Sequence, residues 1–163
     1  MIDTIVIGIS DQKISTSPST LVTYALGSCV GIMLHDSSSH IGGMAHIMLP
    51  DSNLMKGQVG MNRMKFADTA IVNMLNAMIA LGAIKSNITA KITGGANMFQ
   101  VSDDFDIGSI GTRNVSSVKK VLKELNIPIV AEDTGEDFGR TVFFDLDTGA
   151  VRVQALGKDI KEI

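Results

Sequence analysis

The 163-residue chain is long enough for one domain with its own hydrophobic core, and its single cysteine excludes an internal disulfide. Its 14 basic and 17 acidic residues are spread along the sequence and give a formal net charge of −3, so no basic stripe is available for a nucleic acid. The sequence has no signal-peptide pattern and no apolar run of about 20 residues. We therefore expect one cytoplasmic domain over residues 1–163, without membrane insertion, nucleic-acid binding, a metal or a cofactor.

The first half of the chain is rich in segments typical of β-strands. Ile2–Ile9 alternates and contains many β-branched residues, and Leu21–Leu26 is a second extended segment. Residues 11–13 are predicted as a turn. Ser28–His35 and Gly42–Leu49 are apolar runs on either side of turn-forming residues, which predicts a β-hairpin.

The register of this hairpin brings a cysteine and a histidine together. A four-residue connection over 36–39 would place His35 opposite His40, and Cys29 opposite His46. Directly opposed residues have Cβ atoms about 4.5–5.5 Å apart, which is close enough for a thiol to reach an imidazole. In this register the apolar residues share one face of the hairpin and Cys29 and His46 share the other. The apolar face comprises Val30, Ile32, Leu34, Ile41, Gly43, Ala45 and Ile47.

Two amphipathic helices are predicted in the second half. Apolar residues recur every three or four positions over Met61–Leu81, and Gly82 can close that helix. Ile88–Thr93 is predicted as a strand. A second helix is predicted over Asn114–Leu125, with Thr112 or Asn114 as its N-cap.

The C-terminal part returns to strands. Ile129–Glu132 is a short strand after a proline, and Thr141–Leu146 with Ala150–Ala155 predicts a second hairpin. Residues 158–163 are expected to form a charged tail. Since strands outnumber helices and are mostly joined by hairpins, the predicted class is α+β with a mixed or antiparallel sheet.

Cys29 is a candidate nucleophile because of its surroundings. His46 follows seventeen residues later, and Thr23 stands six residues earlier. A neighbouring imidazole can take the thiol proton, and a hydroxyl on the second ring nitrogen would fix the tautomer. Backbone N–H groups of Gly27 and Ser28 are candidate oxyanion donors. Taken singly, each residue has a structural alternative: an inert buried thiol, a core histidine, a strand threonine and bend residues.

A metal site made of the three histidines is the competing arrangement. His40 and His46 are six residues apart along extended chain, which separates them by roughly 20 Å. That distance is too large for one shared metal, and His35 and His40 lie by the turn. We therefore exclude a three-histidine metal site.

Four further residues are candidates for structural or substrate contacts. Gly94 and Gly95 do not begin a phosphate-binding motif, but their backbone can approach another group closely. Arg113 stands at the start of the second helix, where its charge does not complement the helix dipole. Asn114 is adjacent to it.

Four segments carry a likeness to a known family: Thr23–Val30, Gly42–Pro50, Gly94–Phe99 and Ile110–Asn114. Together, and in this order, they resemble CheD, the chemoreceptor glutamine deamidase family. The resemblance implies two packed mixed or antiparallel sheets flanked by helices, in a layered α/β/β/α sandwich similar to the catalytic domains of deamidating toxins. It also implies that Cys29 is the nucleophile, His46 the general base and then acid, and Thr23 the third residue of the triad.

The implied reaction is hydrolysis of glutamine side-chain amides in methyl-accepting chemotaxis receptors, and a methyl ester could follow the same route. The resemblance further implies a CheC-type phosphatase as regulatory partner. One alternative is a non-enzymatic signalling module that binds and stimulates this phosphatase. Another is a cysteine peptidase or a transglutaminase-like acyl transferase, because both form the same kind of thioester.

Overall fold

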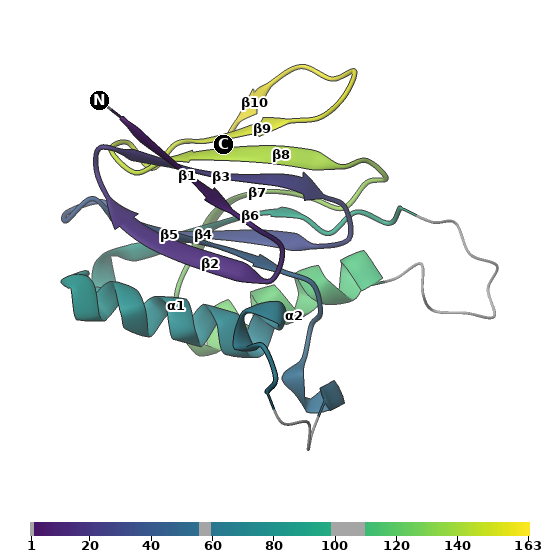
Figure 1. Cartoon of the computed structure of the whole chain (residues 1–163), viewed down its shortest axis with the longest axis horizontal. Coiled ribbons are helices and arrows are strands. Elements are labelled where there is room, and N and C mark those ends of the chain that lie inside the picture. The colour runs from purple at the N-terminus through teal and green to yellow at the C-terminus, as the bar shows by residue number, and fades with distance from the viewer. Residues whose placement is uncertain (1, 56–59, 99–109) are drawn as a thin grey trace.

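Two five-stranded sheets and two α-helices build the part of the chain that a computed structural model describes, residues 2–55, 60–98 and 110–163 (Figure 1). The first sheet has the order β1 (Asp3–Ile7), β3 (Ser19–Leu26), β8 (Arg140–Asp145), β9 (Val151–Gln154) and β10 (Lys161–Glu162). The second has the order β2 (Asp11–Thr16), β5 (Ile41–Ile47), β4 (Val30–Asp36), β6 (Ile88–Gly94) and β7 (Ile129–Thr134). Both sheets are mixed, because β1 runs parallel to β3 and β6 runs parallel to β7.

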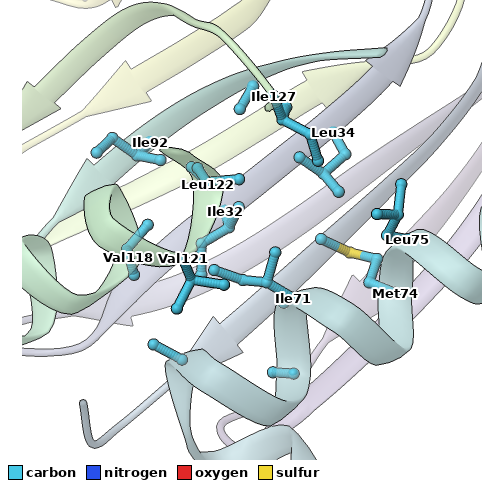
Figure 2. Packing of buried hydrophobic residues seen from close by; sticks show 14 of the residues in the cluster. Ile32, Leu34, Ile71, Met74, Leu75, Ile92, Val118, Val121, Leu122 and Ile127 are labelled. Atoms are coloured by element: carbon cyan, nitrogen blue, oxygen red, sulfur yellow. The ribbon is translucent and has the colours of Figure 1, made fainter. Parts of the chain in front are cut away.

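The helices α1 (Ala67–Leu81) and α2 (Ile110–Glu124) form a third layer (Figure 1). Their apolar side chains pack on one face of the second sheet, and Figure 2 shows side chains from both helices meeting Ile32, Leu34 and Ile92 of β4 and β6. None of the helices in the described ranges combines the length and apolar character needed to cross a membrane.

A second apolar cluster fills the space between the two sheets. It joins residues of β3 and β8, such as Leu21 and Phe144, to Met33 and Met44 on the other face of the second sheet. The α+β class and the two packed mixed sheets are therefore confirmed. The order of layers differs from the α/β/β/α arrangement in one respect, because both helices cover the second sheet. The outer face of the first sheet has no helix of the described residues on it and carries half-exposed and polar residues.

The central hairpin has the predicted faces but a different register. Every residue of β4 and β5 is buried, with Val30, Ile32 and Leu34 toward the helices. His46 lies opposite Gly31 rather than Cys29, and residues 37–40 rather than 36–39 form the connection. This shift by two residues leaves every side chain on its predicted face.

The cause of the register shift lies in the turn. A carboxylate oxygen of Asp36 accepts hydrogen bonds from the N–H groups of Ser38 and Ser39, and His40 adopts a left-handed backbone with φ 55°. The aspartate therefore belongs to the end of β4 and organises the turn that follows it. His35 consequently pairs with Gly42 and not with His40.

The two helices begin at positions other than those predicted. α1 starts at Ala67 rather than at Met61, because the chain before it forms a 3-10 turn at Arg63–Lys65. The Lys65 carbonyl accepts hydrogen bonds from the N–H groups of Met48 and Leu49, so it is not available to α1. Its end at Gly82, where φ is +119°, is confirmed. The other two short 3-10 helices are Ser52–Met55 and Lys85–Asn87.

α2 starts at Ile110, four residues before the predicted start, so the expected caps lie inside the helix. Asn114 directs its side chain away from its own helix, to carbonyls of other segments. An asparagine near a helix start is typical of a cap, which is why the sequence pattern placed the boundary too late.

Two further segments differ from the prediction. Residues 11–13, predicted as a turn, begin β2, and the chain reverses just before them at Ser10, whose φ is 58°. Residues 158–163, expected as a charged tail, end in β10, which pairs with β9. Ile163 packs against the apolar cluster between the sheets, and Lys161 forms an ion pair with Asp133, so these contacts hold the segment.

Candidate active site

Residues Gly27, Ser28 and Cys29 form the loop that connects β3 with β4, and hence the first sheet with the second. The Cys29 side chain is partly buried and packs against the apolar cluster between the sheets. Cys29 stands two residues before Gly31, the residue directly opposite His46. The thiol and the imidazole therefore belong to the same side of the second sheet, although they are not directly opposed.

Two glycines let the end of β6 run beside this loop. Gly94 has φ +104°, and a Cβ built on it would lie 2.4 Å from the Cys29 carbonyl oxygen. Gly95 has φ +67°, and its Cβ would lie 2.2 Å from Cγ2 of Val115 in α2. A side chain at either position would push the loop or the helix away. These glycines thus allow the loop and α2 to lie close to the end of β6.

Thr23 and His46 meet between the two sheets, where both are fully buried. The Thr23 hydroxyl donates to the carbonyl oxygen of Ile7 at 2.9 Å and lies 2.7 Å from Nδ1 of His46. A hydroxyl has one hydrogen, so toward the ring it accepts, and Nδ1 must carry the proton of the neutral imidazole. The lone pair of the ring is consequently on Nε2.

Nε2 of His46 is buried and has no hydrogen-bond partner in the described part of the chain. Burial lowers the pKa of His46 to about 4, so the ring is neutral near pH 7. Burial likewise raises the pKa of the Cys29 thiol, an effect that the hydrogen bond from its own backbone N–H partly offsets. The resting site therefore contains a thiol and a neutral imidazole with a free acceptor nitrogen, rather than a preformed thiolate–imidazolium pair.

The start of α2 packs against the same loop. A Cβ on Gly111 would lie 2.4 Å from the Ala96 carbonyl oxygen, and Asn114 donates to the carbonyl oxygens of Ser28 and Met48. Arg113 is next to Asn114 but has an exposed side chain. The structure thus brings Asn114 to the loop and leaves Arg113 on the surface.

Several contributors were not predicted from the sequence. The Ile7 carbonyl accepts a hydrogen bond from the Thr23 hydroxyl, and the Ala96 N–H donates one to the Gly27 carbonyl. Both are backbone groups, and residue types do not reveal them. Thr93 lies opposite Gly31, across from His46, with a buried hydroxyl that has no partner in the described residues. Strand alternation could have placed Thr93 on this face once β6 was assigned.

The remaining histidines lie elsewhere, by the β4–β5 turn. Nε2 of His35 is 2.9 Å from the Leu146 carbonyl oxygen, and Nδ1 of His40 is 2.8 Å from that of Asp147. Within residues 2–55, 60–98 and 110–163, no three histidine, cysteine, aspartate or glutamate side chains are grouped so that they could hold a metal ion.

The fold and the site together define an α+β sandwich with a cysteine loop beside a buried histidine–threonine pair. A family model described as CheD chemotactic sensory transduction matches residues 48–155. A Clostridium novyi protein named "Probable chemoreceptor glutamine deamidase CheD" is 50% identical over 161 residues, 99% of this chain and 98% of its own length. A Moorella thermoacetica protein of the same name is 46% identical over 158 residues, 96% of this chain and 93% of its own. The chain therefore belongs to the CheD family.

The comparisons differ in the part of the site that they cover. The family model begins to match at Met48, after Thr23, Cys29 and His46, whereas the two relatives align over nearly the whole chain. Phe99, the last residue of the segment Gly94–Phe99, lies outside the described residues.

A solved structure supports the fold independently. The crystal structure of the Neisseria meningitidis protein NMB0706, of family model DUF152, matches with a TM-score of 0.52 and 10% identity over 83% of this chain. The chain spans 64% of the length of that protein. At so low an identity the likeness concerns the fold alone.

Proposed function

We propose that this protein hydrolyses glutamine side-chain amides of chemoreceptors to glutamate in the cytoplasm, with Cys29 as nucleophile, His46 as general base and acid, and Thr23 as the residue that orients His46. The observation that carries the proposal is the relay from Ile7 through Thr23 to Nδ1 of His46, which leaves Nε2 as an acceptor. Relatives named as chemoreceptor glutamine deamidases support the choice of substrate.

The first half of the reaction forms a thioester. Nε2 of His46 takes the Cys29 proton as the sulfur attacks the carboxamide carbon, and the carbonyl oxygen becomes an oxyanion. Backbone N–H groups of the loop from Gly27 to Cys29 would stabilise that charge. The imidazolium then protonates the amide nitrogen, the C–N bond breaks and ammonia leaves.

The second half hydrolyses the thioester. Nε2 removes a proton from water, the hydroxide adds to the thioester carbon and the C–S bond breaks. The sulfur regains its proton from the imidazolium, and the product is a glutamate side chain. A methyl ester would follow the same steps with methanol as the leaving group.

The raised pKa of Cys29 and the low pKa of His46 influence the timing of the first proton transfer. Both groups favour their neutral forms in the free protein, so charge separation before substrate binding is unfavourable. The proton transfer therefore accompanies attack on a bound carbonyl, when oxyanion donors compensate the new charge. For an exposed thiol of ordinary pKa, loss of the proton would not depend on a bound substrate in this way.

A CheC-type phosphatase is proposed as a second partner of the same surface. Exposed apolar side chains border the loop: Tyr24 in β3, Met48 after β5, and Met98, whose Cγ would lie 3.3 Å from a Cβ at Gly27. A protein that covers these residues would shield apolar surface and block Cys29 together. A module that acts only by stimulating the phosphatase would keep this binding in Cys29→Ala and would leave receptors unaltered.

Mass spectrometry of receptor cytoplasmic fragments tests the enzymatic proposal. Incubation with the wild-type protein is expected to replace amide NH2 by OH at particular glutamines, and Cys29→Ala is expected to leave the fragments unchanged. Cleaved peptide bonds would identify a peptidase instead, and incorporation of an added amine would identify a transglutaminase-like acyl transferase.

A further inference from the structure

Asn114 joins two segments of the candidate site. Its side chain is fully buried, and Nδ2 donates to the carbonyl oxygens of Ser28 and Met48, each at 2.9 Å. Ser28 precedes the nucleophile, and Met48 directly follows the strand that carries His46. Since both acceptors are carbonyl oxygens, the NH2 side of the amide must face them. Oδ1, on the opposite side, is buried without a hydrogen-bond partner in the described residues.

The loop is anchored through three consecutive carbonyl groups. The Gly27 carbonyl accepts from the Ala96 N–H and the Cys29 carbonyl from the Gly95 N–H, both at 2.8 Å. The Ser28 carbonyl between them accepts from Asn114. The outer two donors belong to the backbone, so Asn114 is the side-chain donor in this set of three.

Anchoring the Ser28 carbonyl also orients the next N–H group. The peptide bond is planar and trans, so the Ser28 C=O and the Cys29 N–H lie in one plane and point in opposite directions. With the carbonyl turned toward α2, the Cys29 N–H points away from that helix. An N–H beside the attacking sulfur lies where the oxyanion of an acyl-transfer reaction forms.

We propose that Asn114 is the positioning residue of the oxyanion site, which holds the Ser28 carbonyl so that the Cys29 N–H is directed at the oxygen of the group under attack. The inference rests on the proposed function for the identity of the nucleophile. Asn114 acts through the peptide and does not itself touch the substrate.

Two reactions of the same thiol separate this role from a general structural one. With p-nitrophenyl acetate, the Cys29 sulfur bonds to the carbonyl carbon, the oxygen becomes negative and p-nitrophenolate leaves, while the thiol proton passes to His46. With iodoacetamide, the sulfur displaces iodide from a saturated carbon and no oxyanion forms. Cys29 is the only cysteine of the chain, so both rates report on it after subtraction of the Cys29→Ala background.

Asn114→Ala is expected to slow acylation by about tenfold to hundredfold, because one oxyanion donor loses its orientation, and to change alkylation by less than about threefold. The matched control is Ser117→Ala in the same helix, which removes a hydrogen bond of 2.6 Å to the Pro50 carbonyl and leaves the Ser28 carbonyl in place. Both of its rates should equal those of the wild type. Asn114→Ser keeps one donor hydrogen on a shorter side chain, should slow acylation less than Asn114→Ala, and serves if Asn114→Ala does not fold.

Equal slowing of acylation and alkylation in the Asn114 variants would overturn the proposal, because it would indicate general damage to the site. Unchanged acylation would overturn it as well. If wild-type protein leaves receptor glutamines unaltered while the ratio of the two rates still falls in Asn114→Ala, the deamidase proposal fails and the positioning role stands.

Discussion

Thr23 holds His46 through one hydroxyl group, and Thr23→Val removes that group while keeping the shape of the side chain. In the wild type the hydroxyl donates to the Ile7 carbonyl at 2.9 Å and accepts from Nδ1 of His46 at 2.7 Å. In the variant, the Nδ1 hydrogen and the Ile7 carbonyl both lose their partner inside the fully buried site.

The size of the effect follows from these two groups. Each buried group left without a hydrogen bond costs about 1–3 kcal/mol, so the free energy of unfolding should fall by roughly 2–6 kcal/mol in denaturant titrations. The ring also loses the contact that keeps its proton on Nδ1, and the other tautomer cannot accept the Cys29 proton. We expect kcat for deamidation to fall by about tenfold to hundredfold, which corresponds to about 1.4–2.8 kcal/mol of activation free energy.

Thr23→Ser provides the matched control, because it keeps the hydroxyl and deletes a methyl group. Its kcat should stay within about threefold of the wild type. Deamidation should be followed on receptor fragments under saturating substrate, with unfolding measured on the same samples. Wild-type kcat in a folded Thr23→Val protein, or equal losses in the serine and valine variants, would refute the orienting role of Thr23.

Two other predictions concern stability. Gly94→Ala places a Cβ 2.4 Å from the Cys29 carbonyl oxygen at φ +104° and should lower the free energy of unfolding by about 2–4 kcal/mol. Gly157→Ala, at φ +74° with no atom within 4 Å of its Cβ, should lower it by only about 1 kcal/mol. Similar losses in the two variants would contradict the steric argument. His46 has its pKa lowered from 6.5 to about 4, so the unfolded chain binds more protons between these values and stability should fall by roughly 3 kcal/mol as pH decreases through that window. This part of the pH dependence should disappear in His46→Gln.

Strand alternation was sufficient to predict the faces of the central hairpin, because both of its strands are buried on both sides and their apolar residues follow a period of two. The register depended on one turn. Asp36 organises that turn through its carboxylate, and a turn-forming aspartate can belong either to the connection or to the end of a strand. The pairing of Cys29 with His46 was consequently displaced by two positions, while their shared side was preserved.

The candidate triad could be proposed from residue types and spacing, but its supporting contacts could not. Thr23 meets His46 across two different sheets, and the Ile7 carbonyl that completes the relay is a backbone group of a third strand. Asn114 has the residue type of a helix cap, and only the packing of α2 against the loop reveals that its donor hydrogens serve Ser28 and Met48. Such contacts depend on tertiary packing, which local sequence patterns do not encode.

The most direct test of the central claim is the mass of receptor cytoplasmic fragments after incubation with wild-type protein and with Cys29→Ala. Wild-type protein should convert particular glutamines to glutamates, which peptide mapping would locate, and the alanine variant should convert none. Unaltered fragments with the wild type, or equal conversion by both proteins, would contradict a deamidase that acts through Cys29.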